Sequence, residues 1–237
     1  AVWAPPAFLP RAGAGLLLRS FQELGRVSPG FDPENVLTFH ITTSWAETGN
    51  QKALHQFVTR VLDGLRSVPG VESAATTYWL PGVPGEYEVE LKVAEGRAET
   101  EPKLIVQSRA VSPAYFATMR IPLLAGDLCR TDASAPAVMV NRTFVSTYMR
   151  GSSPLGMHLS QPGNAYVPRS EIRGIVGDAR DAGLDRAPLP TVYWCFGGTQ
   201  PGTYFVVRWR GQLNDVAQGI RRKMAELEPS RSVYDFA

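Results

Sequence analysis

Apolar positions recur in two similar β-α-β patterns, one near each end of the chain. In the first, Leu37, Phe39 and Ile41 alternate with polar residues, which is typical of a half-buried strand. A helix follows between Gly49-Asn50 and Pro69-Gly70, and its apolar face comprises Leu54, Phe57, Val58, Val61, Leu62 and Leu65. A second strand runs from Val71 to about Trp79. We expect the two strands to form a parallel pair joined by a right-handed crossover.

The second pattern lies at the C-terminal end. Tyr204–Trp209 is predicted to be a strand, and Ser232–Phe236 a short final strand. Between them a helical apolar stripe ends before Pro229; it comprises Leu213, Val216, Ile220, Met224 and Leu227. Two such segments that share one sheet make a ferredoxin-like, split β-α-β lobe.

The stretch after the first pattern extends this lobe. Residues 87–93 alternate apolar with charged side chains, and 103–111 forms a further strand. Ser112-Pro113 is expected to start a short helix, with the serine hydroxyl as its cap.

The middle of the chain has a smaller pattern of its own. It contains strands at Ala137–Val140, Glu171–Asp178 and Thr191–Phe196, and a helix at Asn141–Met149. We therefore expect an α+β fold in which a smaller α+β lobe is inserted into the split lobe. The boundaries are 1–30 for an N-terminal segment, 31–122 with 202–237 for the split lobe, and 123–201 for the inserted lobe.

Composition narrows the classes of function. Hydrophobic residues make up 44% of the 237 and charged residues 19%, which is enough for a packed core. The chain has 24 basic and 22 acidic residues, a net charge of +2, and no basic run. This balance predicts no nucleic-acid partner.

The sequence offers no constellation for catalysis or for metal binding. Its three histidines and two cysteines are far apart, and no nucleophile-elbow motif is present. Asp178, Asp181 and Asp185 do not make a calcium loop, because Arg180 and Ala182 stand where oxygen ligands are needed. We expect a protein that is not an enzyme and has no cofactor.

Two sets of residues leave alternatives open. Cys129 and Cys195 either form a disulfide, if the compartment is oxidising, or are two buried apolar thiols. The aromatic residues Tyr78, Trp79, Tyr193 and Trp194 either line a cleft for a lipid or hydrophobic small molecule, or belong to the core or the interface between lobes.

Several stretches of the chain together carry a family resemblance: Gly15–Phe21, Pro29–Thr38, Leu65–Glu72, Val111–Gly126, Val138–Asn141, Ser153–Gly156 and Gly174–Tyr193. They resemble the extracytoplasmic domain of MacB-like ABC transporter permeases, and Gly15–Phe21 and Pro29–Thr38 resemble its start. Within that family the chain is most similar to the large duplicated orphan permeases. The two cysteines stand where the family more often has other residues.

The resemblance implies a domain on the periplasmic side of the inner membrane, with a porter-like lobe and an inserted lobe. Residues 1–30 would continue from a missing transmembrane helix; Ala12–Leu18 is itself far shorter than the roughly 20 residues that span a bilayer. Such domains are not catalytic and couple the motion of their own transmembrane helices to a substrate or partner. An ATPase subunit or domain on the cytoplasmic side is implied, and a periplasmic adaptor or substrate protein is a further candidate partner. The alternative is a soluble periplasmic module that binds a lipid or hydrophobic small molecule between its lobes.

Overall fold

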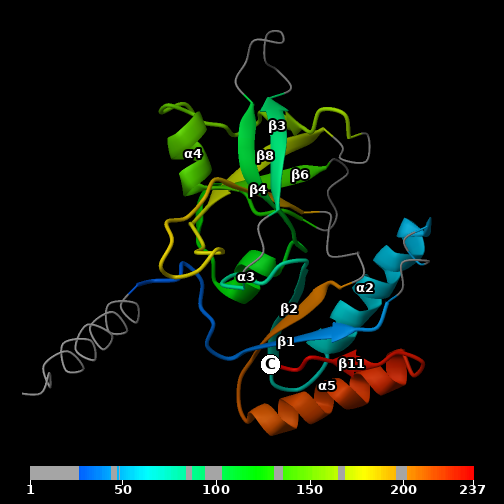
Figure 1. Ribbon diagram of the computed structural model, residues 1–237. Coiled ribbons are helices and arrows are strands. Elements are labelled where there is room, and N and C mark those ends of the chain that lie inside the picture. Colours follow the sequence, from blue (N-terminus) through cyan, green and yellow to red (C-terminus); the bar gives the residue numbers. More distant parts are fainter. Residues whose placement is uncertain are drawn as a thin grey trace, which may run out of the picture.

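Two β-sheets with a short helix between them organise the molecule (Figure 1). This computed structural model describes residues 27–43, 47, 49–83, 87–93, 103–130, 136–164, 169–195 and 202–237. The stretches 12–18 and 15–21, and most of the N-terminal segment 1–30, lie outside the described residues. Within the described ranges no helix has the length and apolarity that crossing a bilayer requires.

The first sheet, which we call the helix-backed sheet, interleaves the two ends of the chain. Its strand order is β11-β1-β10-β2, and every neighbouring pair is antiparallel. The strands are β1 (Val36–Ile41), β2 (Val71–Thr77), β10 (Tyr204–Trp209) and β11 (Val233–Tyr234). Because β10 bonds to both β1 and β2, these two run parallel but do not pair. The expected direct parallel pair is therefore wrong.

Helices α2 (Gln51–Arg66) and α5 (Leu213–Leu227) cover one face of the helix-backed sheet (Figure 1). The predicted apolar stripes of both helices face the strands except for Leu213, which is exposed at the start of α5. Phe39 and Phe205 of the sheet stack on each other with ring centroids 5.6 Å apart. The side chain of Asn50 caps α2 by accepting a hydrogen bond from the backbone N–H of Ala53. The helical periodicity of the sequence is confirmed in both segments.

The second sheet closes on itself, and we call it the closed sheet. Its order is β5-β8-β6-β9-β4-β3-β7, and an additional β7–β8 pairing joins six of the seven strands into a ring. The strands are β3 (Glu88–Val93), β4 (Leu104–Ala110), β5 (Leu123–Gly126), β6 (Ala137–Asn141), β7 (His158–Ser160), β8 (Ser170–Val176) and β9 (Thr191–Trp194). Helix α4 (Arg142–Tyr148) follows β6, and the side chain of Asn141 caps it.

Strands β3 and β4 differ from the expected partition. They lie within 31–122, which we assigned to the porter-like lobe, yet both belong to the closed sheet. The reason is pairing: β4 runs parallel to β9, and the buried Leu91 of β3 packs in the same core as Val138 and Ile172. Alternation along β3 correctly predicted which of its faces is dry, but alternation carries no information about which sheet the strand joins.

Helix α3 (Tyr115–Met119) lies between the two sheets (Figure 1). The expected cap is wrong, because Ala114 holds the N-cap position and makes no side-chain hydrogen bond there. The hydroxyl of Ser112 instead accepts a hydrogen bond from the backbone N–H of Thr76 on β2, at 2.9 Å. A tertiary bond to the neighbouring strand has replaced the local cap.

One apolar core joins both sheets through α3. Ala75 and Val206 contribute from the helix-backed sheet, Phe116 from α3, and Met139 and Tyr193 from the closed sheet. All five side chains are almost fully buried. A continuous hydrophobic interface of this kind opposes relative motion of the parts that it joins.

We predict that the two sheets unfold together. Phe116→Ala removes a side chain that is 1% exposed, and should lower the free energy of unfolding by about 3–5 kcal/mol within a single transition. Leu213→Ala, at a position that is 44% exposed, is the control and should change stability little. Calorimetry and spectroscopically monitored thermal unfolding check this. Two separate transitions, only one of them shifted by Phe116→Ala, would contradict it.

Candidate functional site

A buried arginine fixes the N-terminal part of the described chain to the rest of the molecule. Arg208 on β10 is 3% exposed, and its guanidinium donates to three carbonyl oxygens. Nε bonds to Thr118 at 2.7 Å, Nη1 to Glu34 at 2.6 Å and Nη2 to Asp32 at 2.6 Å. Nη1 also lies 3.4 Å from Oδ2 of Asp32. These bonds compensate the cost of burying the charge.

The strand pattern explains why Arg208 points to this place. On β10, Phe205 and Val207 pack under the helices, while Val206 contributes to the core on the opposite face. Because side chains alternate, Arg208 lies on the face of Val206, beside α3. Sequence reasoning missed this residue, although one charge inside the otherwise apolar Tyr204–Trp209 was a usable signal.

Residues 27–35, which we call the strap, run from this arginine across to the closed sheet. The backbone N–H of Asp32 donates to the carbonyl of Met119 at 2.9 Å, and Oδ2 of Asp32 accepts from Arg120 at 2.7 Å. The N–H of Glu34 first of all, and then Arg120 and Arg208, lower the pKa of Asp32 against the opposing effect of burial.

Two contacts attach the strap to the segment after β8. The carbonyl of Pro29 accepts from the N–H of Arg180 at 2.9 Å. Gly30 has φ +81°, and a Cβ there would lie 1.7 Å from the carbonyl oxygen of Asp178, so only glycine fits. The strap is therefore bonded to α3, to β10 and to the closed sheet, and a pull on it reaches both sheets.

The C-terminal residues attach next to the strap. Ala237 exchanges two backbone hydrogen bonds with Thr38, at 2.9 and 3.1 Å, and the ring of Phe236 stacks on Phe39 at 4.9 Å. Thr38 lies on β1, only a few residues beyond the strap. The last residues thus attach to β1, the strand that follows the strap (Figure 1).

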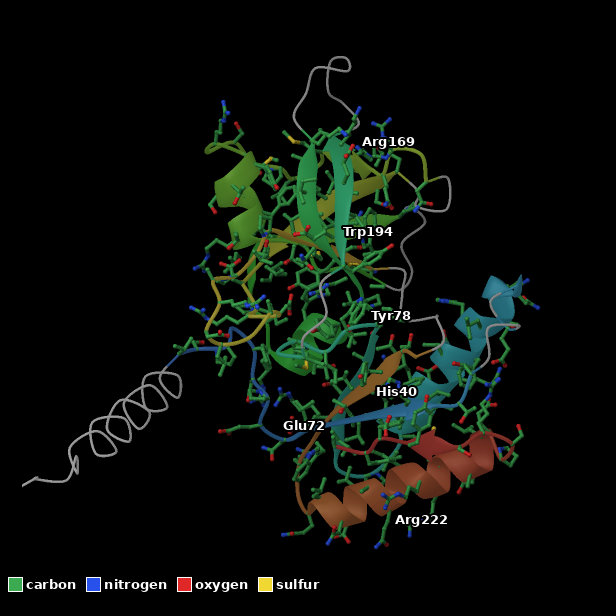
Figure 2. All side chains as sticks on the ribbon, in the orientation of Figure 1. His40, Glu72, Tyr78, Arg169, Trp194 and Arg222 are labelled. Carbon is green, nitrogen blue, oxygen red and sulfur yellow. A yellow bond between two sulfur atoms is a disulfide. The ribbon has the colours of Figure 1, made fainter. Side chains whose placement is uncertain are left out.

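We predict that Arg208→Met lowers the free energy of unfolding by about 2–4 kcal/mol, because it leaves the buried carbonyl of Thr118 and the part-buried carbonyls of Asp32 and Glu34 without this donor. Arg208→Lys should recover part of this loss, since one ammonium cannot reach all three carbonyls. Chemical denaturation of both variants measures the effect. Arg222→Met, which removes an exposed arginine of α5, is the matched control (Figure 2). Equal stability of Arg208→Met and this control would contradict the prediction.

A second buried ion pair lies between β4 and the segment that follows β8. Nε of Arg109 is 3.6 Å from Oδ2 of Asp181, and the two side chains are 5% and 10% exposed. Oδ2 of Asp181 and the hydroxyl of the neighbouring Tyr193 have no hydrogen-bond partner among the described residues. Burial raises the pKa of Asp181 to about 6, although Arg109 acts in the opposite direction.

This shift predicts a pH dependence of stability. The pKa of Asp181 rises from 3.8 to about 6 on folding, so between these values the folded chain binds more protons than the unfolded chain. The free energy of unfolding should therefore rise by about 1 kcal/mol as the pH falls from about 7 to about 5. Denaturation at several pH values measures it. Asp181→Asn should remove this component, and an unchanged profile in that variant would contradict the assignment.

The structure joins the two cysteines. Cys129, shortly after β5, and Cys195, directly after β9, form a disulfide with Cα atoms 6.0 Å apart. The bond closes a sequence separation of 66 residues, for which chain entropy gives a stabilisation of about 4 kcal/mol. It fastens the segment after β5 to the closed sheet, next to the core that the two sheets share.

Two of the four predicted cleft residues are core residues. Tyr193 is 1% exposed and packs edge to face on Phe116, at 5.2 Å. Trp194 is 4% exposed, lies within the closed sheet, and donates from Nε1 to the hydroxyl of Ser108 (Figure 2). The cleft interpretation is wrong for this pair. Tyr78 and Trp79 are half-buried and contact each other edge to face, and their role in a cleft stays a prediction.

Among the described residues, two surface hollows are large enough to be candidate binding sites. One, of about 640 Å³, lies between α2 and the segments at Ser112–Ala114 and Cys129-Arg130; we call it the interlobe groove. The other, of about 510 Å³, lies beside the strap, and we call it the strap pocket. Among the described residues no group of three or more histidine, cysteine, aspartate or glutamate side chains could hold a metal ion.

Comparison with solved structures finds the same fold in transporter domains. The periplasmic region of MacB from Actinobacillus actinomycetemcomitans matches with a TM-score of 0.56 and 13% identity, over 90% of this chain and 94% of that one. The extracellular domain of the noncanonic ABC-type transporter YknZ from Gram-positive bacteria matches with a TM-score of 0.52 and 13% identity. This match covers 85% of this chain and 100% of that one. A domain described as part of a permease from Porphyromonas gingivalis matches with a TM-score of 0.53 and 11% identity. This match covers 89% of this chain and 92% of that one.

No protein-family model and no curated protein matches the chain. At 11–13% identity the structural matches establish the fold alone. They nevertheless confirm, at that level, the resemblance on which the sequence analysis relied. The chain has the mixed α+β fold of the extracytoplasmic domains of MacB-like ABC transporter permeases.

Proposed function

We propose that this chain is the extracytoplasmic domain of an ABC transporter permease and couples the motion of transmembrane helices to an external substrate or partner. The observation that carries the proposal is the fold match over 85–90% of the chain to domains of that kind. In this proposal the domain is not catalytic and lies on the periplasmic side of the inner membrane. ATP is hydrolysed by a cytoplasmic ATPase subunit or domain, and a periplasmic adaptor or substrate protein is the candidate external partner.

We also propose a division into two lobes. The helix-backed sheet would be a ferredoxin-like, porter-like lobe, since it combines two β-α-β halves in the order β11-β1-β10-β2. The closed sheet would be the inserted lobe, and it takes in β3 and β4 as well as the strands of 123–201.

The proposed coupling is by motion of the domain as one rigid body. The shared core around Phe116 opposes any change in the spacing of the lobes. The strap and the C-terminal residues attach to adjacent places, so displacement of either would move both sheets together. Force on residues 27–35 passes to the core through Arg208 and its three carbonyl partners.

Labelling in intact cells tests the location. A single cysteine at Arg222, an exposed position on α5, should react with a membrane-impermeant maleimide without lysis. The parent chain, whose two cysteines form the disulfide, is the control for background labelling. Labelling only after lysis would place the domain on the cytoplasmic side and defeat the proposal.

Distance measurement tests the rigid coupling. In the complete permease, spin labels at Arg222 and at the exposed Thr147 of α4 report the spacing of the two sheets. We expect that spacing to be the same with and without nucleotide, while the distance between the domain and the membrane-spanning part changes. A nucleotide-dependent change between the two labels would show that the lobes move separately.

A second candidate function is a soluble periplasmic module that binds a lipid or hydrophobic small molecule between the lobes. The interlobe groove favours it, because its lining combines apolar residues such as Leu62 and Pro113 with two arginines, Arg66 and Arg130. Oleic acid should then raise the melting temperature of the chain, and Ala114→Trp, which fills the groove, should abolish the effect. No shift with oleic acid or with a screen of hydrophobic drugs would remove this candidate.

A further inference from the structure

The strap pocket concentrates positive charge. Arginines from three separate segments line it: Arg120 follows α3, Arg142 begins α4, and Arg180 lies after β8. Two carboxylates, those of Asp32 and Asp178, share the lining. Whether the pocket favours an anion therefore depends on which of these charges are already paired.

Both carboxylates are engaged by the protein itself. Asp32 accepts from Arg120 at 2.7 Å and lies next to Arg208, which does not line the pocket. Oδ1 of Asp178 accepts from the backbone N–H of Thr143 at 2.9 Å. Ion pairs with Arg120 and Arg208 balance the charge of Asp32. Asp178 forms no ion pair within the described chain and keeps its charge, so the lining has one unpaired carboxylate against the two remaining arginines.

Two of the arginines keep donors available. Arg142 is exposed, and its guanidinium makes no hydrogen bond or ion pair with any part of the chain that the structure describes. Arg180 donates from Nη1 alone, to the carbonyls of Leu184 and Arg186, so Nε and Nη2 remain free to donate within the described chain. Two guanidinium groups with unused donors thus border one hollow.

We propose that the strap pocket binds a phosphate group, with Arg142 and Arg180 as its donors. A guanidinium presents paired N–H groups that match two oxygens of one phosphate, which makes arginine well suited to this ligand. The pocket volume of about 510 Å³ leaves room for more than the phosphate itself. The ligand is either a free phosphate compound or the headgroup of a phospholipid, and the two sources share this recognition chemistry.

Titration with inorganic phosphate tests the chemistry. Backbone amide signals of Gly30 and Gly177, which line the pocket, should shift and saturate when phosphate replaces chloride at constant ionic strength. Arg142→Gln should weaken this binding by about tenfold through the loss of one charge-assisted contact. Arg222→Gln, at an exposed arginine of α5 that also has no partner in the described chain, should leave it unchanged (Figure 2).

A vesicle arm distinguishes the sources. The chain is floated with phosphatidylcholine vesicles that either contain or lack phosphatidylglycerol. Flotation that requires phosphatidylglycerol and Arg142 identifies a lipid headgroup, whereas saturable phosphate binding without flotation identifies a free phosphate compound. No saturable shift at the pocket amides, or equal affinities of Arg142→Gln and Arg222→Gln, overturns the proposal. These results do not depend on where the domain lies in the cell, so they are separate from the labelling test of the proposed function.

Discussion

Burial of apolar side chains between the two sheets is the interaction on which the rest of the structure depends. Each sheet has a core of its own, but α3 fills the space between the sheets with Phe116 and Met119, and these contact both. Without that shared core the domain would be two lobes on a hinge. With it, the strap, the disulfide and the buried arginine all attach to one body, so they position each other as well as their own surroundings.

Polar groups make this body specific as well as stable. Arg208 and the pair of Arg109 with Asp181 are charges in places where apolar residues would pack at lower cost. Hydrogen bonds to three carbonyl groups offset the cost of burying Arg208, and they tie the strap to α3 and β10. One carboxylate oxygen of Asp181, in contrast, has no hydrogen-bond partner among the described residues, and burial raises the pKa of this side chain. The two sites show the difference between a buried charge that orders a chain segment and one that makes the free energy of unfolding increase as the pH falls.

Local patterns in the sequence predicted the elements well and their partners poorly. The stripes of α2 and α5, and the dry face of β3 at Val89 and Leu91, were legible because burial imposes a period on neighbouring residues. The place of β10 between β1 and β2 could not be predicted in this way, since strand pairing joins residues far apart in the chain. The prediction that Ser112 caps α3 was wrong for the same reason, because its hydroxyl bonds to Thr76 on β2 instead.

The candidate site was harder to predict than the fold. Cys129 and Cys195 were named, but their pairing depends on a Cα separation that the sequence does not contain. Tyr193 and Trp194 attracted attention as aromatic neighbours, yet they lie in the core. The arginines of the strap pocket come from three segments, so only the folded chain brings them together.

The position of β10 also has a consequence for biosynthesis. Because β10 is an interior strand of the helix-backed sheet, β1 and β2 have no partner across that gap until residues 204–209 have been made. This sheet therefore cannot form before residues 204–209 have been made, and the facing edges of β1 and β2 stay open to aggregation until then. Protection by chaperones during synthesis would matter more here than in a fold whose central strands are neighbours in sequence.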